Sequence, residues 1–551
     1  MTSPQARIRP DHVTPRRASD LAAALGAPAP DTDAEVTGVV SDNRAAGPGD
    51  LFVALPGARV HGARFAADAV ARGATAVLTD PAGAALLEAE ATTSARPAVL
   101  VVADPRAAAG PAAAHVYGAP AERLVTFGLT GTNGKTTTTY QLDHVLRALG
   151  RRCGLVGTVE TRSGDRVLPS VLTTPEAADL QAVLAAMVSD GVEALTMEVS
   201  SHAIAQHRVD GVVYDVAGFT NLTQDHLDFH GDLETYFATK AELFTPARSR
   251  RGVVVVDDEH GAEMARRAEV PVATLSTGTG VRPLDPGADW TVSGVAPDGT
   301  GSAFTLTHRD GRTLRTRTAL PGGYNVANAA LAAVMVLESG ADVDAVDQAL
   351  RAVDGLTATV PGRMEVLATS PRVVVDFAHN TEALELALSA LRPTTKGRLS
   401  VVFGATGDRD PGKRPFMGAA AVRGADVVVV TDDDPHGEDR AAVRAAVLDG
   451  ARAALAGLGR DVELTEIADR ADAIARAITS AGADDTVLVA GRGHETIQEV
   501  AGVDHHLDDR EEARAALAAR QEHESEGRSM RPKHEGTGRP MRPKHERESG
   551  A

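Results

Sequence analysis

The chain contains little of what an extracellular, membrane-spanning or metal-cluster protein needs. Its 551 residues include one cysteine, Cys153, which excludes an intrachain disulfide framework and a cysteine-built zinc site and fits a reducing compartment. The opening segment, residues 1–20, lacks the apolar core of a signal peptide, and nowhere do about 18 apolar residues follow one another. We therefore expect a cytoplasmic protein that does not enter a membrane.

Positive charge is also in short supply. The 56 lysines and arginines are outnumbered by 75 acidic residues, which gives a formal net charge of −19. Phosphate backbones are bound by basic surfaces, so this balance disfavours a nucleic-acid partner. A nucleotide substrate remains compatible with it, because a phosphate pocket needs only local N–H groups and one or two cations. The 43% apolar and 24% charged residues are typical of a soluble globular enzyme.

The length and the pattern of apolar runs predict an α/β protein of three domains and a tail. Residues 1–120 and 121–357 alternate short apolar runs with helical patterns, and residues 285–320 carry the alternation of antiparallel strands. Residues 358–520 contain near-continuous apolar strands such as ADVVVVTD, which are typical of a parallel sheet. Residues 521–551 contain a near repeat, RPKHE, and few large apolar side chains, so we expect a disordered tail.

The strongest motif is GTNGKTTTT, which follows an apolar strand and precedes a helical pattern. Gly131 and Gly134 allow a tight turn close to phosphate oxygens, and the helix N-terminus offers unpaired N–H groups. Lys135 can reach the β- and γ-phosphates, and the Thr136 hydroxyl can bind Mg²⁺. The spacing is a shortened variant of the usual phosphate loop, and it predicts a site for ATP or GTP. The predicted nucleotide-binding residues of this loop are Gly131, Thr132, Asn133, Gly134, Lys135, Thr136 and Thr137.

Further segments extend the pattern along the chain. In order they are MEVSSHAIAQHRVDG, TNLTQDHLDFHG, YFATKAELF, GRMEV, DFAH, GDRDPGKRP and VLVAGRGHE. Together with the phosphate loop they resemble the Mur ligase family, and within it the UDP-N-acetylmuramyl-tripeptide synthetases, over roughly residues 36–515. The resemblance implies an N-terminal UDP-binding domain, a central P-loop ATPase domain and a Rossmann-like C-terminal domain that binds an amino acid.

The resemblance also implies a reaction. ATP phosphorylates the free carboxylate of UDP-N-acetylmuramoyl-L-alanyl-D-glutamate, and the amine of a diamino acid attacks the acyl phosphate. This is an ATP-dependent ligation in the synthesis of peptidoglycan precursors, with ATP and Mg²⁺ required. A carboxylate is a poor electrophile and phosphate a good leaving group, so the protein must gather several anionic partners and neutralise them. We expect a monomer.

The family roles can be assigned to matching positions of this chain. The catalytic residues implied are Lys135, Glu198, His226 and Lys240. The Mg²⁺ ligands implied are Thr136, Glu198, His226 and a carbamylated Lys240 (N6-carboxylysine). Asp376 and His379 would face the nucleotide. The UDP-substrate contacts implied are Ser41, Asn43, Thr173, Thr174, Ser200, Gln206 and Arg208. The amino-acid contacts implied are Arg409, Asp433, Asp434, Pro435, His436, Gly491 and Glu495.

The chain departs from the family pattern at a few of these positions. Asn43 replaces a serine, and Leu172 replaces an asparagine that can hydrogen-bond. Members that use meso-diaminopimelate have Asp-Asn-Pro-Arg, whose arginine grips the distal carboxylate, where this chain has Asp433-Asp434-Pro435-His436. Loss of that fork and gain of an anion favour lysine or ornithine, with diaminopimelate still possible.

Two other functions remain open. Folylpolyglutamate synthetases share the phosphate loop and the domain plan but lack the N-terminal UDP domain, whose signature here is SDNRAAGPGDLFVALPGARVHG. An inactive paralogue that only binds would be expected to have lost Lys135, Thr136, Glu198 or Lys240, and all four are present.

Overall fold

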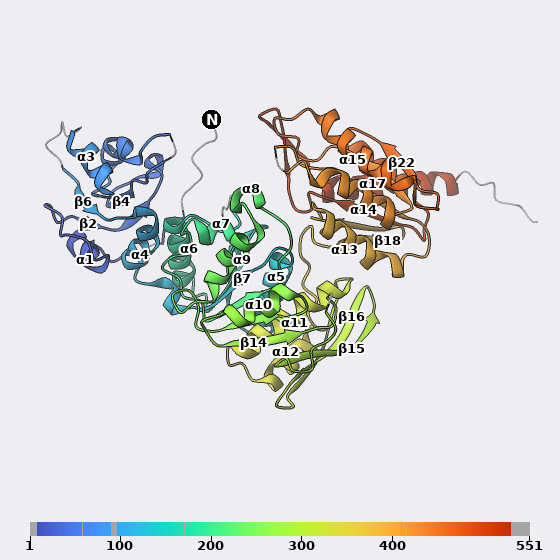
Figure 1. The fold of residues 1–551 in the computed structure, drawn as a ribbon, viewed down its shortest axis with the longest axis horizontal. Helices are drawn as coiled ribbons and strands as arrows, with labels where there is room; N and C mark the ends of the chain where they lie inside the picture. The colour runs from blue at the N-terminus through green and yellow to red at the C-terminus, as the bar shows by residue number, and fades with distance from the viewer. Residues whose placement is uncertain are drawn as a thin grey trace, which may run out of the picture.

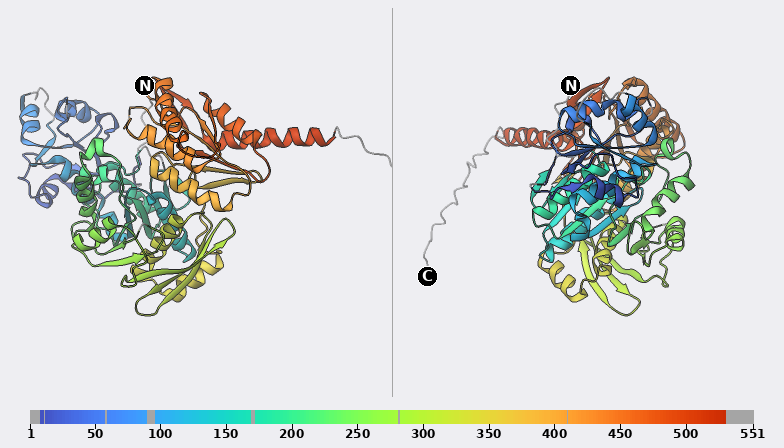
Figure 2. Two further views of the ribbon diagram at one scale, coloured as in Figure 1. Left: turned by 45° about the vertical axis from the view of Figure 1, so that its right-hand side comes forward. Right: turned by 90° about the vertical axis from the view of Figure 1, so that its left-hand side faces the viewer.

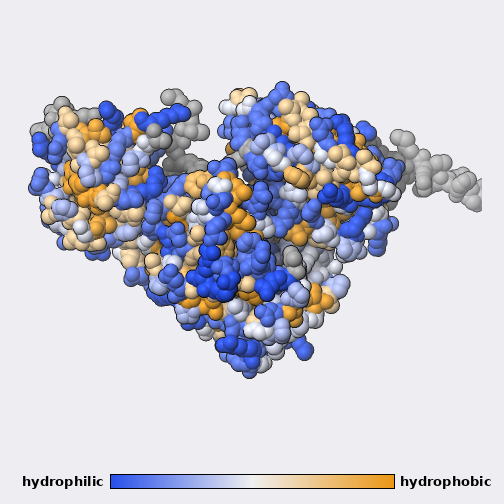
Figure 3. Space-filling view, in the orientation of Figure 1, coloured by the Kyte–Doolittle hydropathy of each residue, from blue (hydrophilic) through white to orange (hydrophobic). Residues whose placement is uncertain are grey.

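The computed structural model describes residues 8–10, 12–57, 59–89, 96–168, 172–280, 282–408 and 410–529, with side chains to 522. Its main sheets form three bodies that follow one another along the chain. The N-terminal body lies on one side of the central body and the C-terminal body on the other (Figure 1). The space-filling view shows a notch between the two outer bodies, above the central one (Figure 3). The described residues include no helix that is both long enough and apolar enough to cross a bilayer.

The N-terminal body is a four-stranded parallel sheet of order β3-β4-β5-β6, whose strands are almost entirely buried. A short antiparallel pair, β1 with β2, lies beside it. The strands are β1 (Arg16–Arg17), β2 (Glu35–Val36), β3 (Gly38–Val40), β4 (Asp50–Val53), β5 (Ala76–Thr79) and β6 (Ala98–Val101). The helices are α1 (Ala18–Ala24), α2 (Ala66–Ala71), α3 (Pro81–Ala89) and α4 (Pro105–Tyr117), with 3-10 turns η1 (Asn43–Ala45), η2 (Gly62–Phe65) and η3 (Pro120–Arg123).

The central body is built on an eleven-stranded sheet of order β10-β9-β8-β11-β7-β12-β13-β14-β15-β16-β17. Its strands are β7 (Val125–Thr130), β8 (Cys153–Val156), β9 (Thr161–Ser163), β10 (Arg166–Leu168), β11 (Ala194–Glu198), β12 (Val216–Phe219), β13 (Gly252–Val255), β14 (Val272–Ser276), β15 (Trp290–Asp298), β16 (Gly301–His308) and β17 (Thr313–Thr318). Strands β15, β16 and β17 pair antiparallel, which confirms the prediction for residues 285–320.

Helices cover both faces of this sheet because alternate strand residues point to opposite sides. On β11, Leu195 and Met197 belong to one core and Ala194 to the other. The helices are α5 (Lys135–Ala148), α6 (Ala177–Ser189), α7 (Ser201–Ala205), α8 (Leu227–His230), α9 (Leu233–Ala241), α10 (Glu259–Arg267), α11 (Gly323–Glu338) and α12 (Val343–Ala352), with the turn η4 (Glu242–Phe244).

The register of the central sheet brings three motifs together at the carboxyl ends of its strands. Strand β7 lies between β11 and β12, and all three run parallel. Glu198, the last residue of β11, pairs with Leu129, and Phe219 at the end of β12 pairs with Thr130. The carboxyl ends of parallel strands are where open α/β sheets bind ligands. The phosphate loop, Glu198 and the loop after residue 219 therefore meet.

The C-terminal body has a six-stranded sheet of order β18-β19-β23-β20-β21-β22, parallel except for β18. Its strands are β18 (Glu365–Thr369), β19 (Arg372–Asp376), β20 (Leu399–Phe403), β21 (Val427–Val430), β22 (Glu463–Glu466) and β23 (Thr486–Ala490), followed by the hairpin β24 (Ile497–Val500) and β25 (Val503–His506). The helices are α13 (Thr381–Leu391), α14 (Lys413–Gly424), α15 (Arg440–Leu455), α16 (Arg470–Ser480) and α17 (Asp509–Ser529), with the turn η5 (Arg392–Thr394). Asp376 pairs with Ala490, so the DFAH and AGRGHE motifs leave the sheet side by side.

The boundary that we predict for the tail is too early. Helix α17 continues past residue 520 to Ser529 and projects from its domain (Figure 2). Ala513 and Ala516 anchor its first half in the core, and acidic residues in its first turn favour helix formation there. The helix then continues as one cooperative element, although little in its sequence can be buried. Residues 530–551 of the predicted tail lie outside the described residues.

Candidate active site

The phosphate loop joins the end of β7 to the start of α5. Gly131 (φ 148°) and Gly134 (φ 88°) have positive φ angles, and a Cβ at Gly131 would collide with the Thr220 hydroxyl. The Lys135 ammonium donates to the carbonyl oxygens of Gly131 and Thr132, both at 2.9 Å. Burial lowers the pKa of Lys135, while Glu198 and Asp225 oppose that shift. The lysine thus lies folded against its own loop.

Glu198 is the predicted metal ligand that the structure fixes most firmly. Its side chain is buried, and its Oε2 accepts from the Thr136 hydroxyl at 2.9 Å. Thr158 holds both carboxylate oxygens, through its N–H to Oε1 at 2.8 Å and its hydroxyl to Oε2 at 3.0 Å. A Cβ at Gly157 would collide with Oε1. A hydroxyl and a carboxylate at the head of a phosphate loop are the hard oxygen donors that Mg²⁺ prefers, so these residues fit that ion.

Lys240 is not the surface lysine that its helical pattern suggests. It is 1% exposed, and its ammonium donates to the Gly131 carbonyl at 2.8 Å and lies 4.4 Å from the centre of the Tyr236 ring. Desolvation, and next the neighbouring Lys135, hold the pKa of Lys240 well below its usual range. A neutral amine beside the phosphate loop is what carbamylation requires.

His226 lies at the start of α8 in a left-handed conformation, with φ 55°. Desolvation lowers its pKa to about 4, against the opposing effect of Asp225. A neutral imidazole is a competent metal ligand. The described residues contain no ready-made cluster of three His, Cys, Asp or Glu groups. A cation here would draw on Thr136 and Glu198, and on phosphate oxygens of the nucleotide.

The predicted UDP-substrate residues fall into two groups. Thr174, Ser200, Gln206 and Arg208 form a connected cluster beside Glu198. The Thr174 hydroxyl donates to the Glu198 carbonyl at 2.9 Å, and Arg208 donates to Gln206 Oε1 at 2.7 Å. Thr173 joins them through Thr158, with 3.1 Å between the hydroxyls.

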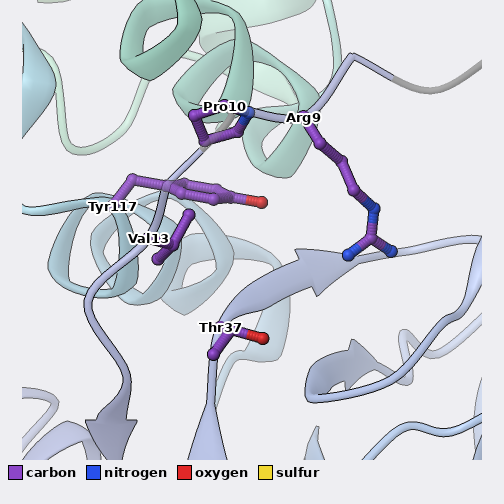
Figure 4. Close-up of a pocket in the computed structure, with 5 residues that line it drawn as sticks. All are labelled: Arg9, Pro10, Val13, Thr37 and Tyr117. Atoms are coloured by element: carbon purple, nitrogen blue, oxygen red, sulfur yellow. The ribbon is translucent and has the colours of Figure 1, made fainter. Parts of the chain in front are cut away.

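The second group belongs to the N-terminal body. Ser41 and Asn43 follow β3 on the surface, and Asn43 donates to Asp68 at 2.8 Å. A separate cavity of about 190 Å³ in this body is lined by Arg9, Pro10, Val13, Thr37 and Tyr117 (Figure 4). It contains none of the predicted site residues.

In the C-terminal body, Asp376 and His379 lie where β19 ends. The Asp376 carboxylate accepts from the Met364 N–H at 2.7 Å, and burial raises its pKa while Arg363 opposes that shift. The Nδ1–H of His379 donates to the Phe377 carbonyl at 2.8 Å, and desolvation lowers the pKa of His379. Both side chains lie close to the partly buried Arg363.

The DDPH loop folds against the β24–β25 hairpin. Asp434 pairs with the fully buried Arg492 at 3.0 Å and accepts from the Glu499 N–H at 2.6 Å. The Nδ1 atom of His436 lies 2.9 Å from Glu499 Oε2. The Pro435 carbonyl accepts from the Glu438 N–H at 3.0 Å and closes the turn.

Asp433, Gly491 and Glu495 lie close together beside this loop. The side chain of Asp433 is buried, 3.9 Å from Arg470, and a Cβ at Gly491 (φ 119°) would collide with it. Desolvation, and next the nearby Asp433, raise the pKa of Glu495 to about 8. Arg409, the remaining predicted amino-acid contact, lies outside the described residues.

Several residues of the site carry no assigned role in the sequence analysis. Thr158 donates to Glu198, the partly buried Arg363 lies beside Asp376, and Glu382 accepts from Asn133 of the phosphate loop at 2.9 Å. Arg363 is part of GRMEV, so that motif was a usable signal for it. Thr158 and Glu382 lie outside the quoted motifs, and only the fold brings them to the site.

Comparison with known proteins covers most of the chain. Three family models match in order: "Mur ligase family, catalytic domain" over residues 35–117, "Mur ligase middle domain" over 129–336, and "Mur ligase, glutamate ligase domain" over 362–493. The UDP-N-acetylmuramoyl-L-alanyl-D-glutamate–2,6-diaminopimelate ligase of Streptomyces coelicolor is 47% identical over 515 residues, 93% of this chain and 98% of that one.

Two further comparisons agree. A UDP-N-acetylmuramyl-tripeptide synthetase of Leifsonia xyli subsp. xyli is 46% identical over 94% of this chain and 99% of that one. A solved structure of a UDP-N-acetylmuramoyl-L-alanyl-D-glutamate–2,6-diaminopimelate ligase superimposes with a TM-score of 0.60 at 31% identity, over 88% of this chain and 96% of that one. The predicted three-domain α/β architecture is therefore confirmed, and the chain belongs to the Mur ligase family of ATP-dependent, amide-bond-forming ligases.

Proposed function

We propose that the chain joins a diamino acid to UDP-N-acetylmuramoyl-L-alanyl-D-glutamate, with lysine or ornithine preferred. The observation that carries the ligase chemistry is the convergence at Gly131. Lys135 and Lys240 both donate to its carbonyl, and Thr136 and Glu198 meet one turn away. In this arrangement Lys135 supplies a cation, and Thr136 and Glu198 supply oxygen donors, to a transferring phosphoryl group. Arg208, which pairs with Glu176 at 2.9 Å, would exchange that partner for the carboxylated substrate.

The reaction balances as two displacements. The substrate carboxylate attacks the γ-phosphorus of ATP and releases ADP, and the amine then attacks the acyl carbon and releases phosphate. Lys135 would leave its loop carbonyls to bind the transferring phosphoryl oxygens, and Arg208 would hold the carboxylate in line. Mg²⁺, held by Thr136 and Glu198 together with a carbamylated Lys240 and His226, would neutralise phosphate charge. Docking of the C-terminal body would keep water from the acyl phosphate.

The preference for lysine or ornithine rests on His436 and Glu499. The Glu499 carboxylate accepts from the Nδ1–H of His436, which selects the tautomer whose Nε2 atom is an acceptor. An acceptor suits the ammonium of lysine or ornithine and does not suit the distal carboxylate of diaminopimelate.

The structure changes the expected role of Asp434. Asp434 is expected to repel a substrate carboxylate, but it is neutralised by the buried Arg492. The discrimination must then come from His436 with Glu499, and Arg492 is engaged and not free to bind a second carboxylate. We expect a preference of about tenfold in kcat/KM, because the His436–Glu499 pair is partly exposed and its field is screened.

The variants follow from this pairing. His436→Arg alone should change little, because Glu499 would bind the new guanidinium. His436→Arg with Glu499→Gln should shift preference toward diaminopimelate by freeing the guanidinium for a carboxylate. If the single variant shifts preference as far as the double, the role of Glu499 is wrong.

Two alternatives have separate tests. A folylpolyglutamate-synthetase-like activity would show as ligation of glutamate to a folate, and the match of a family model over residues 35–117 speaks against it. An inactive binding protein would release no phosphate with any acceptor. Phosphate release with ATP, UDP-N-acetylmuramoyl-L-alanyl-D-glutamate and a panel of diamino acids separates both from the proposal.

A further inference from the structure

Glu382 links the C-terminal body to two loops of the central body. It lies in the first turn of α13, three residues after the DFAH motif. Its Oε2 accepts from the side-chain amide of Asn133 at 2.9 Å and from the Thr223 hydroxyl at 2.6 Å. Asn133 belongs to the phosphate loop, and Thr223 precedes His226 by three residues. One oxygen atom therefore ties a helix of one domain to both phosphate-site loops of another.

The two loops are themselves joined at Asn133 and Thr223. The Asn133 N–H donates to Asn221 Oδ1 at 3.0 Å, and its carbonyl accepts from the Thr220 hydroxyl at 2.7 Å. The Thr223 N–H donates to the Thr132 hydroxyl at 3.0 Å. Main-chain groups of Asn133 and Thr223 are thus paired with side chains of the opposite loop, and the Asn133 amide and Thr223 hydroxyl are left to point at Glu382.

The chemistry of Glu382 excludes direct phosphate binding. An ionised carboxylate only accepts hydrogen bonds, and it repels a phosphate anion. Within the described part of the chain, the hydrogen bonds to the Glu382 carboxylate come from two neutral donors, the Asn133 amide and the Thr223 hydroxyl. Stabilisation of the α13 dipole alone would need no contact with another domain. The two short hydrogen bonds from neutral donors indicate instead that Glu382 orients the Asn133 and Thr223 side chains.

We propose that Glu382 is a positioning residue that aligns the phosphate loop with the docked C-terminal body. Its carboxylate fixes the Asn133 and Thr223 side chains only when α13 lies against the central body. The nucleotide site, built from both bodies, is then complete only in the docked arrangement. This inference rests on ATP use, which family membership gives, and not on which diamino acid is the substrate.

The test compares substitutions at Glu382 with a matched control on the same helix. Glu382→Ala should lower kcat/KM for ATP about tenfold or more and weaken ADP binding measured by calorimetry without acceptor. Glu382→Gln should stay within about threefold of wild type, because its amide oxygen can accept both bonds. Glu385→Ala removes an exposed carboxylate from the same helix and should change neither quantity.

A double-mutant cycle adds a readout that a general loss of structure would not give. Thr223→Val removes the hydroxyl at nearly constant volume and should lower kcat/KM for ATP, and Glu382→Ala with Thr223→Val should be no worse than Glu382→Ala alone. The proposal is overturned if the losses in kcat/KM of the two single variants multiply in the double variant. It is also overturned if Glu382→Gln is as impaired as Glu382→Ala, or if Glu382→Ala is as active as Glu385→Ala. If Glu382→Ala lowers the melting temperature, the proposal is tested with Thr223→Val and Glu382→Gln instead. A Thr223→Val variant with unchanged kcat/KM for ATP then overturns the proposal.

Discussion

The raised pKa of Glu495 predicts a stability that falls with pH. Its carboxyl group titrates near 4.5 when exposed and at about 8 in the folded protein, chiefly through desolvation and next through Asp433. Between these values the native state holds a proton that the unfolded chain releases, so stability is full below pH 4.5 and is lost as pH rises toward 8. Each unit costs up to about 1.4 kcal/mol, which amounts to roughly 3 kcal/mol at pH 7.

Glu495→Gln isolates this effect because glutamine is neutral throughout. The Tm of the variant minus that of wild type should grow from pH 5 to pH 8, by roughly 5 °C or more for a domain of this size. Glu385→Gln, at an exposed position, serves as the control and should show no such trend. Thermal unfolding at closely spaced pH values measures both. A Tm difference that stays constant with pH, or that favours wild type increasingly, would refute the reasoning.

Three further substitutions test the phosphate site. Lys135→Ala should abolish turnover at unchanged Tm, and a variant that keeps more than about a tenth of wild-type kcat would contradict the loop assignment. Lys240→Ala should be nearly inactive and partly restored by short-chain carboxylates, since the missing group is an anion; full activity without them would refute carbamylation. Thr158→Val loses the hydroxyl bond that fixes Glu198, so it should lower kcat about tenfold and raise the Mg²⁺ concentration needed, and unchanged Mg²⁺ dependence would argue against this role.

Much of the fold and of the phosphate site follows from sequence because the signals are local. A run such as ADVVVVTD predicts a buried parallel strand, and GTNGK directly after a strand predicts a phosphate loop. The family resemblance then supplies the order of the domains. The end of α17 is missed because composition predicts whether a segment can bury surface, and not how far an anchored helix continues.

The other differences arise from contacts between distant segments. Lys240 reads as an exposed helical lysine, and only tertiary packing buries it beside Gly131. Asp434 has the sequence pattern of a free anion, but its partner Arg492 follows β23, which β20 separates from the strand that precedes Asp434. Glu382 has no local signal at all, since its partners are far away in the sequence. Such pairings depend on which strands become neighbours, which local patterns do not encode.

The most direct measurement is a competition among lysine, ornithine and meso-diaminopimelate at equal concentrations, with ATP and UDP-N-acetylmuramoyl-L-alanyl-D-glutamate, and the UDP-linked products weighed by mass spectrometry. We predict ATP-dependent tripeptide products in which lysine or ornithine exceeds diaminopimelate about tenfold. No tripeptide product with any of the three would contradict the proposed function. A predominance of the diaminopimelate product would leave the ligase intact and contradict the specificity assigned to His436 and Glu499.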